Sequence, residues 1–107
     1  MSEQPRARRS AKAAADANAP WKPVSYELAD ADAIQALMRG DADKGKQQRA
    51  LKFIIENICG AYDVSYRPGG EEGRRDTDFA EGRRFTGLQI IKFLKLNLSA
   101  LRRENNA

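Results

Sequence analysis

Asp76, Asp78 and Glu81 are the residues of this sequence whose types and spacing come closest to a chemical site. Carboxylates are the ligands that Mg²⁺ prefers, and residues three apart share one face of a helix. The same side chains are also favoured in the first turn of a helix, where the helix dipole stabilises negative charge. We therefore interpret them as helix-capping residues, with a metal site as the alternative. We expect no cofactor and no bound metal.

Four arginines flank these acidic residues along the chain: Arg74, Arg75, Arg83 and Arg84. Guanidinium groups pair with carboxylates and also contact phosphate. Two interpretations remain open, and we favour ion pairs, either within the chain or with a neighbouring subunit, over contact with nucleic acid. With Glu81, these arginines are the candidate residues of an interface or an anion-binding site.

The composition argues against catalysis. The sequence contains no histidine and only one cysteine, Cys59. Imidazole acid–base chemistry and an intrachain disulfide are therefore excluded. Cys59 lies in an isoleucine-rich stretch, where we expect a buried, reduced thiol. The Gly-rich run at 69–73 lacks the Gly-Lys-Ser/Thr ending of a phosphate-binding loop. No nucleophile–base pair is visible, so we predict a non-enzymatic protein with no catalytic residues.

Positive charge is concentrated toward the ends of the chain, which carries a net charge of +4. Residues 1–20 are rich in alanine and arginine and have no large apolar residue after Met1. Such a segment cannot bury a hydrophobic face, so we predict a disordered basic tail. The alternative is an arm that contacts nucleic acid through Arg6, Arg8 and Arg9.

Apolar spacing predicts an all-α fold for residues 30–101, a small helical hairpin or three-helix unit. We expect helices near 30–39, 43–59 and 78–96, followed by a short last turn. Asp30 or Asp32 should cap the first helix and Gly40 should end it. Asp41 or Asp43 should cap the second, which Gly60 should end. The apolar stripes of these two helices are Ile34, Leu37 and Met38, and Leu51, Ile54, Ile55 and Ile58.

The connections complete this organisation. Residues 21–29 should form an extended latch over the helices, with an exposed interaction motif as the alternative, and residues 102–107 should fray. Alternation of Tyr62, Val64 and Tyr66 suggests a short extended piece packed on the helices. A long Gly-rich loop should follow, mobile over 67–75, with the last long helix capped by Asp76 or Thr77. Gly82 and Gly87 within that helix suggest close helix packing that compensates their cost.

Residues 45–96 resemble the Bordetella-phage Bbp-nineteen-like domain family of small tailed-phage proteins. The matching pieces are Ile58-Cys59-Gly60, Ser65-Tyr66 and the stretch from Phe79 to Leu88, which is similar to the family pattern F-x-E-G-R-R-x-x-G-L. The resemblance implies an accessory or virion-associated protein that acts through protein–protein contacts, in or near the virion during head–tail assembly. It carries over no catalytic residue; the residues of the pattern mark the fold or its interface: Glu81, Gly82, Arg83, Arg84 and Gly87.

The expected partners are phage structural proteins or further copies of this chain. We expect the host cytoplasm or the virion as location, because no apolar stretch is long enough for a membrane span or a signal peptide. Two alternatives stay open. One is a small nucleic-acid-binding protein that uses its arginine-rich tail and loop. The other is a phage inhibitor of a host enzyme.

Overall fold

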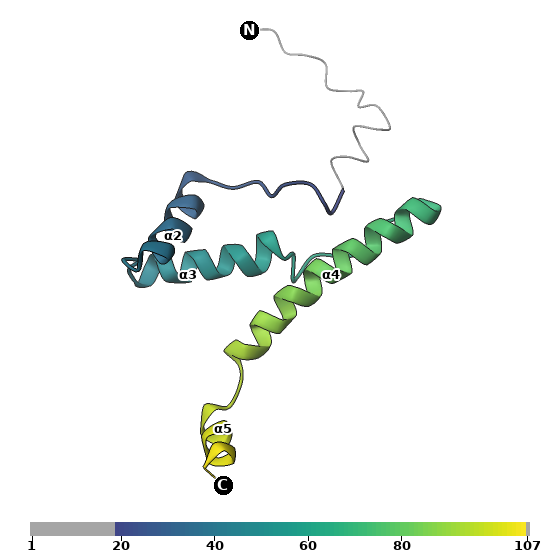
Figure 1. Cartoon of the computed structure of the whole chain (residues 1–107). Helices are drawn as coiled ribbons and strands as arrows, with labels where there is room; N and C mark the ends of the chain where they lie inside the picture. Colours follow the sequence, from purple (N-terminus) through teal and green to yellow (C-terminus); the bar gives the residue numbers. More distant parts are fainter. Residues whose placement is uncertain (1–18, 107) are drawn as a thin grey trace, which may run out of the picture.

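The computed structural model describes residues 19–106, and these contain helices and connecting segments but no strand, as expected for the all-α class. The predicted tail at 1–20, with Arg6, Arg8 and Arg9, lies almost entirely outside the described residues. The helices, labelled as in Figure 1, are α2 (Leu28–Arg39), α3 (Lys44–Lys52), the π-helix η1 (Phe53–Ile58), α4 (Gly70–Leu94) and α5 (Leu98–Asn105).

Helix α2 begins before the expected caps, because Glu27 rather than Asp30 or Asp32 stands at its N-terminus. The backbone N–H of Glu27 donates to the Asp30 carboxylate at 2.9 Å, which is half of a capping box. The helix ends as predicted at Gly40, whose φ of 80° is the left-handed conformation that glycine adopts easily.

Alanines, and not the predicted apolar stripe, bring α2 and α3 together. Ala33, Ala36 and Ala50 are 0% exposed, whereas Met38 of the stripe is 82% exposed. A methyl side chain lets two helix backbones approach closely, so the larger residues are displaced to the sides of the contact. Helices α2 and α3 therefore form a helical hairpin (Figure 1). The hairpin expected from the sequence joins the next two helices through the Gly-rich loop, but there α4 packs mainly against η1 and not along α3.

The helix expected at 43–59 is present, but its last turns are π-helical. Asp43 caps it by accepting the N–H of Lys46 at 2.8 Å. At the other end, the N–H of Cys59 donates to the Ile54 carbonyl, five residues earlier, at 2.9 Å. This wider turn buries Phe53, Ile55 and Cys59, while Ile58 stays largely exposed. Cys59 is thus a buried free thiol, as predicted.

Helix α4 begins at Gly70, so the predicted cap at Asp76 or Thr77 and the predicted mobile loop over 70–75 are both wrong. Gly69 and Gly70 make the turn with positive φ, and two glutamates then occupy the first turn of the helix. The Thr77 hydroxyl accepts the Arg67 N–H at 2.7 Å and donates to the Gly73 carbonyl at 2.8 Å. Thr77 therefore joins the connecting segment to the middle of the helix.

One stripe of small residues carries the packing of α4. Gly73, Ala80 and Gly87 are spaced by seven residues, and all three are buried. A Cβ added at Gly73 would lie 2.5 Å from the Pro68 carbonyl carbon, and one at Gly87 would lie 2.9 Å from the Cβ atoms of Cys59 and Ala61. The connection between η1 and α4 therefore lies directly against the α4 backbone.

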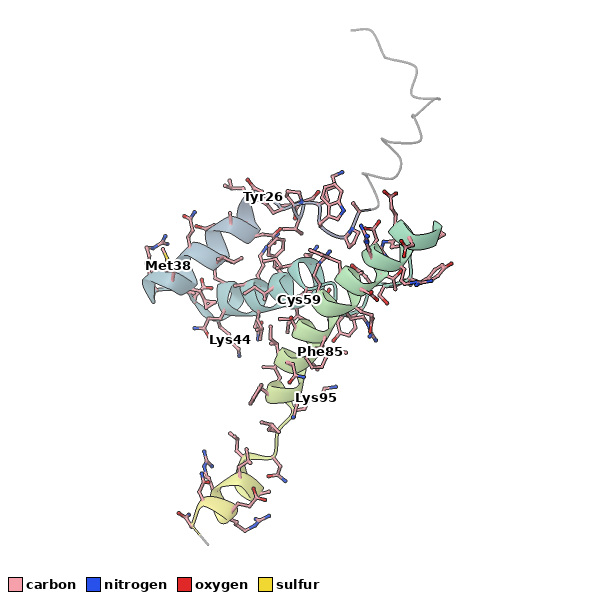
Figure 2. The ribbon with its side chains drawn as sticks, turned by 45° about the vertical axis from the view of Figure 1, so that its right-hand side comes forward. Tyr26, Met38, Lys44, Cys59, Phe85 and Lys95 are labelled. Carbon is pink, nitrogen blue, oxygen red and sulfur yellow. The ribbon has the colours of Figure 1, made fainter. Side chains whose placement is uncertain are left out.

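The remaining segments lie outside this packing. Tyr62, Val64 and Tyr66 are exposed, so the predicted extended piece does not pack its side chains on the helices. Trp21 of the predicted latch is exposed too, although Pro20 beside it is buried. Helix α5 begins with the predicted short last turn and continues to Asn105, over residues where fraying was predicted. It buries none of its residues and projects from the end of α4 (Figures 1 and 2). None of the helices within 19–106 has the length and apolar character that would let it cross a membrane.

Candidate functional site

Arg83 occupies the point where three segments of the chain meet. Its Nε donates to the Ile58 carbonyl at 3.0 Å, its Nη2 to the Asn57 carbonyl at 3.3 Å and its Nη1 to the Pro20 carbonyl at 2.6 Å. The last carbonyls of a helix have no partner in that helix, and a positive charge is favourable there. Arg83 thus caps η1 from α4 and holds the segment around Pro20 against both.

The other predicted interface residues are not gathered around Arg83. Arg84 pairs with Glu81, three residues earlier on the same helix, with Nη1 and Oε1 3.3 Å apart. Arg74 and Arg75 are exposed and form no hydrogen bond or ion pair within residues 19–106. The four arginines therefore differ in what they contact. Arg83 joins three segments, Arg84 forms a surface ion pair, and Arg74 and Arg75 have no partner within residues 19–106.

The acidic residues considered as helix caps or metal ligands lie inside α4. Asp76, Asp78 and Glu81 are in its second to fourth turns, well past the N-terminus at Gly70, so the capping interpretation is wrong. Across residues 19–106, no three carboxylate, thiol or imidazole side chains are grouped closely enough to hold a metal ion.

The two glycines predicted to pack differ in their surroundings. Gly87 lies against Cys59 and Ala61, which agrees with a packing role, although its partner is a turn and not a helix. Gly82 has nothing within 4 Å of the position of its missing Cβ, so no residue of the described chain packs on it. Within residues 19–106, Gly82 therefore has no packing partner of the kind that Gly87 has.

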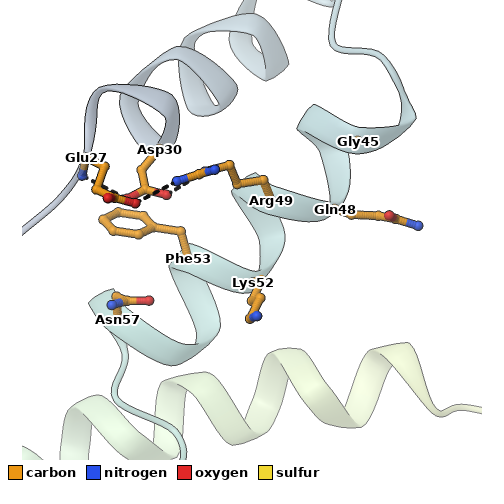
Figure 3. A pocket seen from close by; sticks show the side chains of 8 residues that line it. All are labelled: Glu27, Asp30, Gly45, Gln48, Arg49, Lys52, Phe53 and Asn57. Carbon is orange, nitrogen blue, oxygen red and sulfur yellow. Dashed lines mark hydrogen bonds and ion pairs between the residues drawn. The ribbon is translucent and has the colours of Figure 1, made fainter.

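Sequence reasoning missed a charged cluster that joins α2 to α3. Arg49 Nε lies 2.8 Å from the Asp30 carboxylate, and its Nη2 lies 3.0 Å from the Glu27 carboxylate. These side chains and Phe53 line an open hollow of about 580 Å³ (Figure 3). The hollow is also lined by Gly45, Gln48, Lys52 and Asn57. Because Arg49 is already neutralised by two carboxylates, we interpret the cluster as a structural tie between the helices.

This cluster shifts protonation equilibria. The pKa of Asp30 is lowered from its ordinary 3.8, first by the hydrogen bond from the Glu27 backbone N–H and then by Arg49. The pKa of Arg49 is raised, chiefly by its hydrogen bond to Asp30. No sequence pattern links residues 19 and 22 positions apart, so only the folded chain could identify this cluster.

We expect Asp30→Asn to flatten the acid dependence of stability. Because the pKa of Asp30 is lowered in the fold, its ionised form stabilises the protein above about pH 4, and this is lost as the pH falls through the folded-state value. Urea unfolding from pH 7 to pH 2.5 measures this. Asp41→Asn, a control whose carboxylate pairs only with the exposed Arg39, should keep the wild-type profile. Identical profiles for wild type and Asp30→Asn would contradict the prediction.

Large apolar side chains are left uncovered along α4 and α5. No large side chain in the described chain is fully buried, and alanine supplies much of the core. Exposed side chains on the two helices are Phe79, Phe85, Leu88, Phe93, Leu94, Leu98 and Leu101. Between α3 and α4, a hollow of about 280 Å³ is lined by further apolar groups, among them Leu51, Ile55 and Ile91. We call the exposed apolar residues of α4 and α5 the apolar surface.

Comparison with protein-family models, with curated proteins and with solved structures finds no match to this chain. The resemblance to the tailed-phage family therefore stays a prediction from the sequence.

Proposed function

We propose that this chain is a non-enzymatic bacteriophage accessory or virion-associated protein that works through protein–protein contacts during head–tail assembly. The phage context rests on the sequence resemblance around Phe79 to Leu88. The mode of action rests on the apolar surface of α4 and α5.

That surface is the observation that carries the proposal. Large apolar groups exposed in number are unfavourable in water, and on soluble proteins they usually mark contact sites. Here the large side chains of α4 and α5 are exposed, while the core is built from alanine and a few larger residues. A chain with this distribution gains apolar burial from a partner that its own fold does not supply.

Association with phage particles tests the proposal. A tagged chain should co-purify with particles from infected cells, where mass spectrometry detects it. Replacing Leu94 and Leu98 with aspartate should reduce this recovery at least about tenfold, because each change places a charge in an apolar contact. Val64→Asp alters an apolar residue that is even more exposed but lies away from α4 and α5, and it should leave recovery unchanged. Absence of the wild-type chain from particles and assembly intermediates would overturn the proposal.

The second candidate is nucleic-acid binding, favoured by Arg74 and Arg75, whose side chains are exposed and unpaired within residues 19–106. Arg102 and Arg103 on α5 are exposed as well. This function predicts a gel shift at about 50 mM salt that disappears as the salt concentration rises. The double change Arg74→Ala and Arg75→Ala should weaken the shift, whereas Arg84→Ala, which removes a paired arginine, should not. No shift at low salt would eliminate this candidate.

A further inference from the structure

Gly82 is an open position in the middle of the longest helix. Glycine within a helix costs about 1 kcal/mol relative to alanine, and no close contact from residues 19–106 offsets that cost at Gly82. Phe79 and Phe85 lie three residues to either side, so both are neighbours of Gly82 on the helix surface. They are 48% and 61% exposed, respectively. A second helix that crosses α4 at Gly82 would therefore pack between these two phenylalanines.

This face of α4 continues toward the C-terminus of the helix. Thr86, Gln89 and Phe93 follow Gly82 at intervals of four, three and four residues, the spacing of a helix–helix seam. Phe93 is 68% exposed. The contact with the rest of the chain uses a different stripe, through Gly73, Ala80 and Gly87. No residue within 19–106 packs on this face at Gly82, so the face can meet another molecule.

Charge reverses along α4 close to the same glycine. Before Gly82 the acidic residues outnumber the basic ones, and the acids are Glu71, Glu72, Asp76, Asp78 and Glu81. After Gly82 the helix carries Arg83, Arg84 and Lys92 and no acid, and Lys95 follows at its C-cap. A helix with opposite charge at its two halves is complementary to a reversed copy of itself.

We propose that two copies of this chain pair through this face of α4, antiparallel, with the two-fold axis at Gly82. This arrangement brings Phe79 of one copy opposite Phe85 of the other, on both sides of the glycine crossing. It also brings Glu71 and Glu72 of one copy beside Lys92 of the other. A two-fold interface uses the same patch twice, so each of these contacts occurs twice.

Charge also selects the orientation. A parallel pair would align the acidic half of one α4 with the acidic half of its copy and the basic half with the basic half. The antiparallel pair opposes unlike charges instead. This pairing rests on the proposed action through protein–protein contacts, with a second copy of the chain as the partner at this face. It does not depend on the phage context.

Disulfide trapping tests the geometry in the full chain, with Cys59→Ala to remove the native thiol. The variant Gly82→Cys should form a disulfide-linked dimer under mild oxidation, because both cysteines lie at the two-fold axis. Gln89→Cys is the matched control on the same face. Its two copies should lie about 21 Å apart, beyond the reach of a disulfide. Equal trapping of both variants would indicate a parallel pair and would overturn the proposal.

A mixed experiment adds a positive test. Position 75 of one copy should face position 89 of the other, since both are seven residues from Gly82. Mixing Arg75→Cys with Gln89→Cys should therefore trap the heterodimer faster than either homodimer. Formation of the heterodimer and the two homodimers in random proportions would count against the antiparallel arrangement.

Light scattering tests pairing without cysteines. The wild-type chain should be dimeric at about 100 μM, and Phe85→Glu should be monomeric with an unchanged helical circular-dichroism spectrum, because Phe85 is 61% exposed. Lys92→Glu should weaken dimerisation about tenfold through two lost ion pairs, and adding Glu71→Lys and Glu72→Lys should restore it. A wild-type monomer would overturn the pairing and leave the particle-association test of the proposed function unaffected.

Discussion

Replacing Gly73 with alanine should lower the free energy of unfolding by about 3 kcal/mol, although alanine normally stabilises a helix. The added Cβ would lie 2.5 Å from both the carbon and the oxygen of the Pro68 carbonyl and 2.7 Å from the Arg67 carbonyl oxygen. These are backbone atoms and cannot rotate away as a side chain would. The segment at 67–68 would have to move off α4, which also removes the hydrogen bond between Thr77 and the Arg67 N–H. Urea unfolding followed by circular dichroism measures the loss.

Gly45→Ala is the matched control for this prediction. Gly45 is also a helical glycine, but the nearest atom to its missing Cβ is Asp43 Oδ1 at 3.6 Å, an ordinary contact. This change should stabilise the protein by up to about 1 kcal/mol, since it removes only the intrinsic cost of glycine. If both substitutions shift stability in the same direction, the close approach of the 67–68 segment to α4 is wrong.

Replacing Arg83 with alanine should cost about 2–4 kcal/mol, the second large effect. Three carbonyls of Ile58, Asn57 and Pro20 would lose a charged donor at once. Arg83→Lys should recover only part of this loss, because a single ammonium cannot reproduce the fork that reaches three carbonyls. The adjacent Arg84→Ala removes only an exposed ion pair with Glu81, so it should cost less than about 0.5 kcal/mol.

Trp21 gives this prediction a local readout. It is the only tryptophan of the chain and follows Pro20, whose carbonyl accepts from Arg83 at 2.6 Å. Loss of Arg83 should release this segment, so iodide should quench Trp21 fluorescence more strongly in Arg83→Ala than in wild type or Arg84→Ala. Equal quenching and equal stability of the two alanine variants would show that Arg83 does not hold the three segments together.

Local chemistry made much of the helical content predictable. Gly40 and Gly60 end their helices with positive φ, and Asp43 caps α3, because each of these effects depends only on a few neighbouring residues. Asn97 likewise caps the last helix by accepting the Ala100 N–H at 3.0 Å. The start of α4 was misplaced because acidic residues at 76–81 satisfy the same local preference as a true first turn.

The candidate site was less predictable, because its residues act on partners distant in sequence. Arg83 was predicted as a residue of an interface or an anion-binding site, whereas its partners in the fold are main-chain carbonyls 25, 26 and 63 positions away. Carbonyl acceptors have no sequence signature, so a pattern of acids and arginines suggested ion pairs instead. Arg49 was missed because its partner Asp30 lies 19 positions earlier in the sequence.

The residues around Gly82 show most clearly which features the sequence determines and which only the tertiary structure decides. The sequence by itself determined that the chain is helical, that it lacks histidine-based chemistry and that Glu81-Gly82-Arg83-Arg84 is its most distinctive polar element. Only the tertiary structure decided that Arg83 faces inward to three carbonyls and that Gly82 is open. Periodicity determines which residues share a face of a helix, but the packing of other segments determines which face is covered.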